Sequence, residues 1–131
     1  MTPLRGCDAD APIDPAVLSR DPAVGEAYAA DDLVYHGPLT RPTLEAIFGA
    51  VEKINAGPSF GSLPTLWIHG ENDQLAPVDA TRPAIEHVKG DSLEQHIYPG
   101  AAHEVFNETN KDEVIGHVTS FINAKVAGAA V

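Results

Sequence analysis

The sequence predicts an α/β fold built on one parallel β-α-β unit with flanking helices. From residue 40 onward, its local patterns predict a helix, a strand, a helix, a strand and a helix in turn. The first predicted strand is a continuous apolar run without alternation, which is typical of strands covered on both faces. A right-handed crossover through a helix joins such strands. Because two parallel strands are too few for a sheet of this kind, we expect them to form part of a larger sheet.

The part of the chain before the first predicted strand is predicted to contain one amphipathic helix. We expect residues 1–14 to be an unstructured lead-in, and residues 15–37, with weak apolar spacing, to form short helical turns and loops. A helix of about three turns follows, because apolar residues recur at helical spacing. These residues are Leu44, Ile47, Phe48, Val51 and Ile54. Thr40 and Pro42 suit its start and Gly57 suits its end.

Two strands and a connecting helix come next. Residues 63–70 (LPTLWIHG) predict the first strand, with Pro64 at its start, where strands accept proline. After a polar turn, Asp79 is expected to cap a helix that runs to Val88. Residues 93–98 predict the second strand, which the Pro-Gly pair after it would close.

A strongly amphipathic helix is predicted near the C-terminus. Its apolar positions are Val114, Ile115, Val118, Phe121, Ile122 and Val126. They recur at helical spacing, and Asn110 and Glu113 are placed to cap the start of the helix.

Composition excludes several classes of function. Lys and Arg total 8 against 19 Asp and Glu, and the net charge of −11 repels phosphate backbones and anionic lipid surfaces. Nucleic-acid binding is therefore not expected. Cys7 is the only cysteine, which excludes an internal disulfide and a cysteine-based zinc cluster. With no integral membrane segment and no signal peptide in the pattern, we expect a cytoplasmic protein, or one peripheral to the membrane or cell envelope.

Asp73 and His103 are the candidate catalytic residues. Asp73 follows the first predicted strand and His103 follows the second, so both lie at the carboxyl edge of a parallel sheet, where reactive groups gather. A carboxylate beside an imidazole fixes its tautomer and stabilises the imidazolium, so that the other ring nitrogen can take a proton. The acid-then-histidine order is the one found in α/β-hydrolases. The alternative is a purely structural role, with Asp73 as a turn residue and His103 as a loop residue.

Residues 57–61 match the G-x-S-x-G nucleophile pattern, with Ser59 as its serine. That pattern is meaningful only as a sharp turn from a strand into a helix. Here a helix precedes the motif and a strand follows it, and Pro58 removes an N–H just before the serine. We therefore interpret Ser59 as a loop residue.

The other histidines have structural interpretations. His69, at the end of the first strand, is expected to pack in the core. His87 and His117 fall on predicted helices and His96 on a strand. No histidine pair shows the spacing of a zinc helix, so we expect no metal and no cofactor.

From about residue 15 to residue 126 the sequence resembles the C-terminal half of monoacylglycerol lipases in the serine aminopeptidase/lysophospholipase-like group of α/β-hydrolases, above all the actinobacterial type. The segments that carry the resemblance are residues 19–24 (SRDPAV) with Tyr28, residues 63–77, and residues 98–104 (YPGAAHE) with Asn107 and Glu108. The last two segments together are specific, and the first is a softer likeness to the cap region.

The resemblance implies an α/β-hydrolase fold and a catalytic role for two residues. Asp73 would be the triad acid and His103 the general base. Residues 15–37 would belong to the lid over the acyl-binding pocket, and residues 38–131 to the C-terminal part of the hydrolase domain. The N-terminal half of the sheet, with the serine and the oxyanion-hole amides, would be missing. Asp32 stands where such enzymes usually carry proline, which would loosen the lid.

Two functions follow from these expectations. The first is the C-terminal fragment of a serine ester hydrolase acting on monoacylglycerol or lysophospholipid-type lipids, inactive alone because its nucleophile is absent. The second is a non-catalytic interaction module, or one half of a split hydrolase that needs a serine-bearing partner. An exposed sheet edge would drive such pairing or self-association. A serine-rich partner encoded directly upstream would favour the split hydrolase.

Overall fold

The computed structural model describes residues 12–128, so Cys7 and most of the predicted lead-in lie outside the described residues. The elements in chain order are η1 (Pro15–Val17), α1 (Pro22–Ala30), α2 (Arg41–Ala56), β1 (Thr65–Gly70), α3 (Val78–Val88), β2 (Leu93–Tyr98), η2 (Val105–Asn107) and α4 (Lys111–Gly128). From α2 to α4 this is the predicted order of helix, strand, helix, strand and helix. The α/β class is confirmed.

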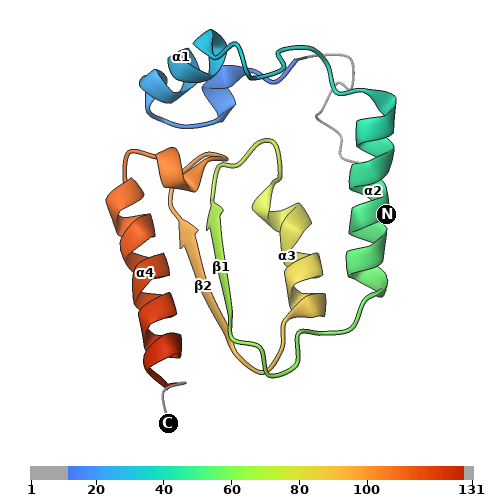
Figure 1. Ribbon diagram of the computed structural model, residues 1–131, viewed down its shortest axis with the longest axis vertical. Helices are drawn as coiled ribbons and strands as arrows, with labels where there is room; N and C mark the ends of the chain where they lie inside the picture. Colours follow the sequence, from blue (N-terminus) through green and yellow to red (C-terminus); the bar gives the residue numbers. More distant parts are fainter. Residues whose placement is uncertain (1–11, 129–131) are drawn as a thin grey trace.

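The two strands are parallel neighbours joined through α3 (Figure 1). Their register pairs Thr65 with Leu93 at one end and Gly70 with Tyr98 at the other. Both α3 and α4 contact β1, and α2 contacts α3. Because the strands point the same way, the loops that follow them emerge side by side at the carboxyl edge, beneath α1 (Figure 1).

The length of α2 and the cap of α3 differ from the expectation, whereas Thr40 and Gly57 bound α2 as predicted. The α2 helix begins at Arg41 and spans 16 residues, which is more than the three turns predicted. The predicted cap of α3 is wrong, because Pro77 occupies the N-cap position and Asp79 lies in the first turn. Pro77 has a fixed φ and no N–H, so the helix starts directly after it. Asp79 still suits the positive end of the helix dipole.

The buried core lies directly below the carboxyl edge of the sheet. It consists of Tyr98, Ala101, Val105 and Val114, with Ile68 packed against them. Ala101 and Val105 flank the loop that carries His103, and Val114 comes from the first turn of α4. This buried cluster therefore supports the loops after the strands.

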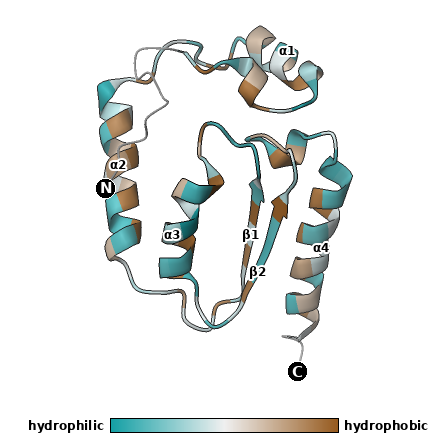
Figure 2. Cartoon of the chain, turned by 180° about the vertical axis from the view of Figure 1, so that it is seen from behind, coloured by the Kyte–Doolittle hydropathy of each residue, from teal (hydrophilic) through white to brown (hydrophobic). Residues whose placement is uncertain are grey.

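The predicted apolar stripe of α2 is exposed. The fractional exposures of Ile47, Phe48, Val51 and Ile54 lie between 40% and 50%. Figure 2 shows hydrophobic residues along this helix, which stands at one side of the molecule beyond α3. An amphipathic helix usually buries its apolar face, so this surface lacks a cover within residues 12–128.

We expect the isolated chain to bind a hydrophobic dye and to self-associate through this face. Replacing Phe48 and Val51 together by lysine should reduce both effects, because it removes apolar surface from the centre of the stripe. Dye fluorescence and light scattering after size-exclusion chromatography measure the outcome. Glu52→Lys is the control, because it changes the charge equally without touching the stripe. A monodisperse, dye-free monomer with a sharp thermal transition would contradict the expectation.

Candidate active site

The loops after β1 and β2 are joined by hydrogen bonds between their backbones. The Glu71 amide donates to the carbonyl of Tyr98 at 3.0 Å, and the Asn72 amide donates to the carbonyl of Ala101 at 2.9 Å. The Gly100 amide donates to Oε2 of Glu71 at 3.0 Å. These bonds continue the pairing of the strands into the loops, so the positions of the two loops depend on each other.

Two glycines allow this close approach. Gly100 has φ +70°, a conformation that favours glycine, and it turns the chain back after β2. Gly70, the last residue of β1, faces the backbone carbonyls of Ala101 and Ala102, and a Cβ at this position would collide with both. The segment just before His103 therefore packs directly on the end of β1.

Asp73 is buried and its carboxylate is well supplied with donors. Oδ1 accepts hydrogen bonds from the amides of Leu75 and Ala76, both at 2.9 Å. Oδ2 lies 2.9 Å from Nδ1 of His103. The side chain of Asp73 is only 3% exposed, so its orientation is set by these contacts. The predicted proximity of Asp73 and His103 is therefore present.

His103 is bonded through only one of its two ring nitrogens within residues 12–128. Since a carboxylate only accepts, Nδ1 carries the proton of this hydrogen bond and Nε2 has a free lone pair in the neutral ring. The side chain is 40% exposed, and no hydrogen bond to Nε2 is found among residues 12–128. The arrangement can take a proton from a group placed above Nε2 and can stabilise the resulting cation.

His69 contributes more than the core packing expected of it. Its side chain is 12% exposed, and Nε2 lies 2.7 Å from the carbonyl oxygen of Ala76, so Nε2 donates. The same nitrogen lies 3.3 Å from Oδ2 of Asp73. Asp73 thus faces two imidazoles. No helical or strand pattern signals this contact, which forms because the turn after β1 folds back on the strand end.

Ser59 lies at the opposite end of the strands, where it was predicted. Its neighbour Phe60 donates to the carbonyl of Val88, and the carbonyl of Gly61 accepts from Asp91, just before β2. A six-residue strand at about 3.3 Å per residue separates the two ends by about 20 Å. Ser59 is therefore not placed to react with His103.

Two of the remaining histidines, His96 and His117, form a separate cluster, and Nε2 of His36 and of His87 each lies near a backbone carbonyl oxygen. His96 and His117 stack with ring centroids 3.9 Å apart, and Nδ1 of His117 lies 3.1 Å from the hydroxyl of Tyr98. Burial raises the pKa of Tyr98, and the negative charge of Glu113 raises it further. Within residues 12–128 no group of three or more His, Cys, Asp or Glu residues is arranged to hold a metal ion.

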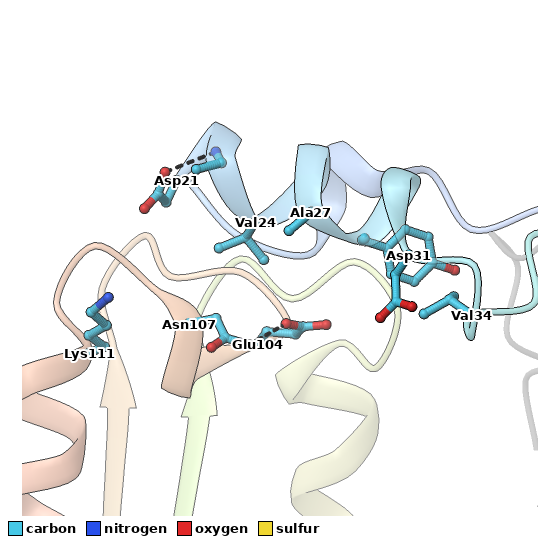
Figure 3. Close-up of a pocket in the computed structure, with 10 residues that line it drawn as sticks. Asp21, Val24, Ala27, Asp31, Val34, Glu104, Asn107 and Lys111 are labelled. Atoms are coloured by element: carbon cyan, nitrogen blue, oxygen red, sulfur yellow. Dashed lines mark hydrogen bonds between the residues drawn. The ribbon is translucent and has the colours of Figure 1, made fainter.

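A hollow of about 450 Å³ lies beside the His103 loop, between α1 and the start of α4 (Figure 3). Val24, Ala27, Tyr28 and Val34 give it an apolar lining, and Asp21, Asp31, Glu104, Asn107 and Lys111 are its polar residues. Glu104 directly follows His103 in the sequence, so the hollow borders the loop of the candidate base, although His103 itself does not line it. In the part of the chain that the structure describes, no helix is long and apolar enough to cross a membrane.

The sequence is similar to a known protein family and to members of it. The sequence profile of the family described as serine aminopeptidase, S33, matches residues 4–110. A monoacylglycerol lipase of Mycolicibacterium smegmatis is 37% identical over 120 residues, which are 92% of this chain and 41% of that protein. An uncharacterised abhydrolase domain-containing protein of Dictyostelium discoideum is 26% identical over 122 residues, or 89% of this chain and 12% of that protein.

Two solved structures share the fold. The monoacylglycerol lipase of Paleococcus ferrophilus has a TM-score of 0.67 and 23% identity over 83% of this chain and 42% of its own. A soluble variant of the monoglyceride lipase of Saccharomyces cerevisiae, solved with a substrate analogue, has a TM-score of 0.75 and 17% identity over 88% of this chain and 41% of its own. The chain thus spans about two fifths of the length of these lipases.

Proposed function

The chain belongs to the serine aminopeptidase S33 family of monoacylglycerol lipase-like α/β-hydrolases, and on that premise we propose that it is the C-terminal part of a serine ester hydrolase. Its substrates would be monoacylglycerol or lysophospholipid-type lipids. The observation that carries the proposal is the 2.9 Å contact between Nδ1 of His103 and Oδ2 of Asp73 at the carboxyl edge of the sheet. In this proposal Asp73 is the triad acid and His103 the general base.

The proposed chemistry uses a serine that this part of the domain does not supply. The serine hydroxyl would attack the ester carbonyl while Nε2 of His103 takes its proton. His103 would then give that proton to the leaving alcohol. In the second half of the reaction it would take a proton from water, which attacks the acyl group, and return it to the serine as the fatty acid leaves. Asp73 would hold His103 in the Nδ1–H tautomer and stabilise the imidazolium.

The proposal assigns the two parts of the chain different tasks. Residues 15–37 would form part of a lid, and residues 38–131 the C-terminal part of the hydrolase domain. The apolar part of the lining, which α1 and Val34 supply, supports this division, because a lipid chain needs an apolar cover.

A second candidate function rests on the exposed apolar stripe of α2. In this alternative the chain is a non-catalytic interaction module, or one half of a split hydrolase that pairs with a serine-bearing partner. The free edge of β1 is suited to such pairing, because β2 occupies only its other side. The split form retains the roles proposed for Asp73 and His103, whereas the non-catalytic module does not.

We expect the purified chain to hydrolyse nitrophenyl esters and monoacylglycerol no faster than background. The reason is that Ser59 lies at the amino end of β1, about one strand length from His103. Ester hydrolysis and labelling by a fluorophosphonate probe measure the outcome, with a complete lipase of the family as the positive control. Labelling of the chain that disappears in Ser59→Ala would contradict this prediction.

A further inference from the structure

Glu108 is the most deeply buried charged residue among residues 12–128, and the chemistry proposed above does not use it. It is 1% exposed, and its side chain is not exposed at all. Oε1 accepts from the amides of Ala102 and Arg20 at 2.6 and 3.2 Å. Oε2 accepts from Nε of Arg20 at 2.9 Å and from the amide of Thr109 at 3.0 Å. A fully buried glutamate with every contact satisfied is rare and calls for a specific role.

One side of this network holds the loop that carries His103. The amide of Ala102, the residue before His103, makes the shortest bond to Glu108, as expected of a hydrogen bond to a charged acceptor. On the other side of His103, the amide of Glu104 donates to the carbonyl of Leu18 at 2.8 Å. The backbone is therefore held on both sides of the imidazole, once by Glu108 and once by the segment before α1.

The other side of the network holds the segment that leads into α1. Besides its bond to Glu108, the guanidinium of Arg20 donates to Oδ1 of Asn110 at 2.8 Å. The hydroxyl of Ser19 donates to the carbonyl of Asn107 at 3.0 Å. These bonds join residues that lie 88 to 90 positions apart in the sequence. Residues 18–20 are thus hydrogen-bonded to the segment that contains His103 and to the residues that follow it.

The charge of Glu108 is maintained by this environment. Burial alone raises the pKa of Glu108, but the hydrogen bonds from Ala102, Arg20 and Thr109 more than offset it, so the pKa lies below its ordinary value. The residue is therefore a carboxylate at neutral pH, and it can accept from all of its donors at once.

We propose that Glu108 is a positioning residue for His103, and that its ion pair with Arg20 couples the segment over the site to the loop of the base. This inference rests on the proposed function for the role of His103. Because of this coupling, displacement of residues 18–20 would weaken both the hydrogen bond that holds the Ala102 amide and the one that holds the Glu104 amide. Movement of the lid segment would then disorder the contact between His103 and Asp73.

The test is the downfield resonance of the His103 Nδ1 proton, observed by NMR in the full chain carrying the two α2 lysine substitutions for solubility. Asp73→Asn identifies this resonance by abolishing it. In Glu108→Gln an NH₂ replaces one of the two carboxylate oxygens, and each oxygen accepts two hydrogen bonds. Two bonds are therefore lost, either those from the Ala102 and Arg20 amides or those from Nε of Arg20 and the Thr109 amide. We expect the His103 proton to exchange with water at least tenfold faster, or its signal to vanish, in a variant that keeps a dispersed spectrum.

Two further variants complete the design. Asp112→Asn removes the same charge from the first turn of α4 and should leave the signal unchanged, because Asp112 takes no part in the hydrogen bonds around Glu108. Arg20→Lys keeps the charge of a side chain that is 40% exposed but cannot reach Glu108 and Asn110 together, so its exchange rate should lie between the wild type and Glu108→Gln. Arg20→Lys decides the question if Glu108→Gln does not fold.

The outcomes separate this inference from the proposed function. An unchanged His103 signal in a folded Glu108→Gln or Arg20→Lys chain would show that Glu108 serves only stability, and would overturn the inference alone. A wild-type chain without any signal that depends on Asp73 would overturn the proposed function as well, because the acid–base pair would then not form in solution.

Discussion

In a complete hydrolase assembled from this chain, His103→Ala should lower kcat for monoacylglycerol by about 10⁶-fold and Asp73→Asn by about 10⁴-fold. The assembly is a chimera in which residues 12–128 replace the matching segment of the Mycolicibacterium smegmatis lipase, which is 41% of that protein. Loss of His103 removes the proton acceptor itself, whereas Asp73→Asn leaves a ring in the wrong tautomer. Steady-state kinetics with a monoacylglycerol measure both effects.

The double variant sharpens this test. Because the two residues are proposed to act as one unit, His103→Ala combined with Asp73→Asn should cost no more than His103→Ala alone. His87→Ala, on the exposed side of α3, and Ser59→Ala are controls that should retain the activity of the chimera. A folded chimera without activity, or one that keeps its activity in Asp73→Asn, would refute the proposed roles.

The candidate site was predictable because it depends on topology. Two strands joined by a helix are parallel, so residues directly after each strand meet at one edge, and this argument led to Asp73 and His103 without knowledge of side-chain positions. The same argument separated Ser59 from the site, although its motif matched a nucleophile pattern. The position of Ser59 before the strand, rather than after it, predicted its role better than the match to the G-x-S-x-G motif did.

The supports of the site were not predictable in the same way. Glu108 was noticed only as part of a family resemblance, and no local pattern connects it with Arg20, 88 positions earlier. A contact between residues so far apart in the sequence depends on how the segment before α1 packs against the sheet. The periodicity of helices and strands does not predict that packing. His69 was assigned to the core for a related reason, since the turn that brings Ala76 back to it has no periodic pattern.

Gly70→Ala should be unusually damaging for the addition of one methyl group. The new Cβ would collide with the backbone carbonyls of Ala101 and Ala102, which cannot rotate away as a side chain would. Relief requires a shift of the segment that carries His103. Overpacking of this kind costs about 1–3 kcal/mol, a large fraction of the 5–15 kcal/mol that stabilises a typical domain. Urea unfolding of the chimera and its kcat measure the two consequences.

The loss of activity should exceed what the loss of stability explains. A misplacement of about 1 Å at a reacting group costs about 10²-fold in rate, so the folded Gly70→Ala chimera should be slower by about that factor. Gly116→Ala in α4 is the matched control, because nothing lies within 4 Å of the added Cβ and alanine favours a helix by about 0.5–1 kcal/mol over glycine. The control should be slightly more stable and equally active. If Gly70→Ala instead behaved like Gly116→Ala, the end of β1 would not press on the loop of His103. In that case the backbone hydrogen bonds between the two loops would not be what positions His103.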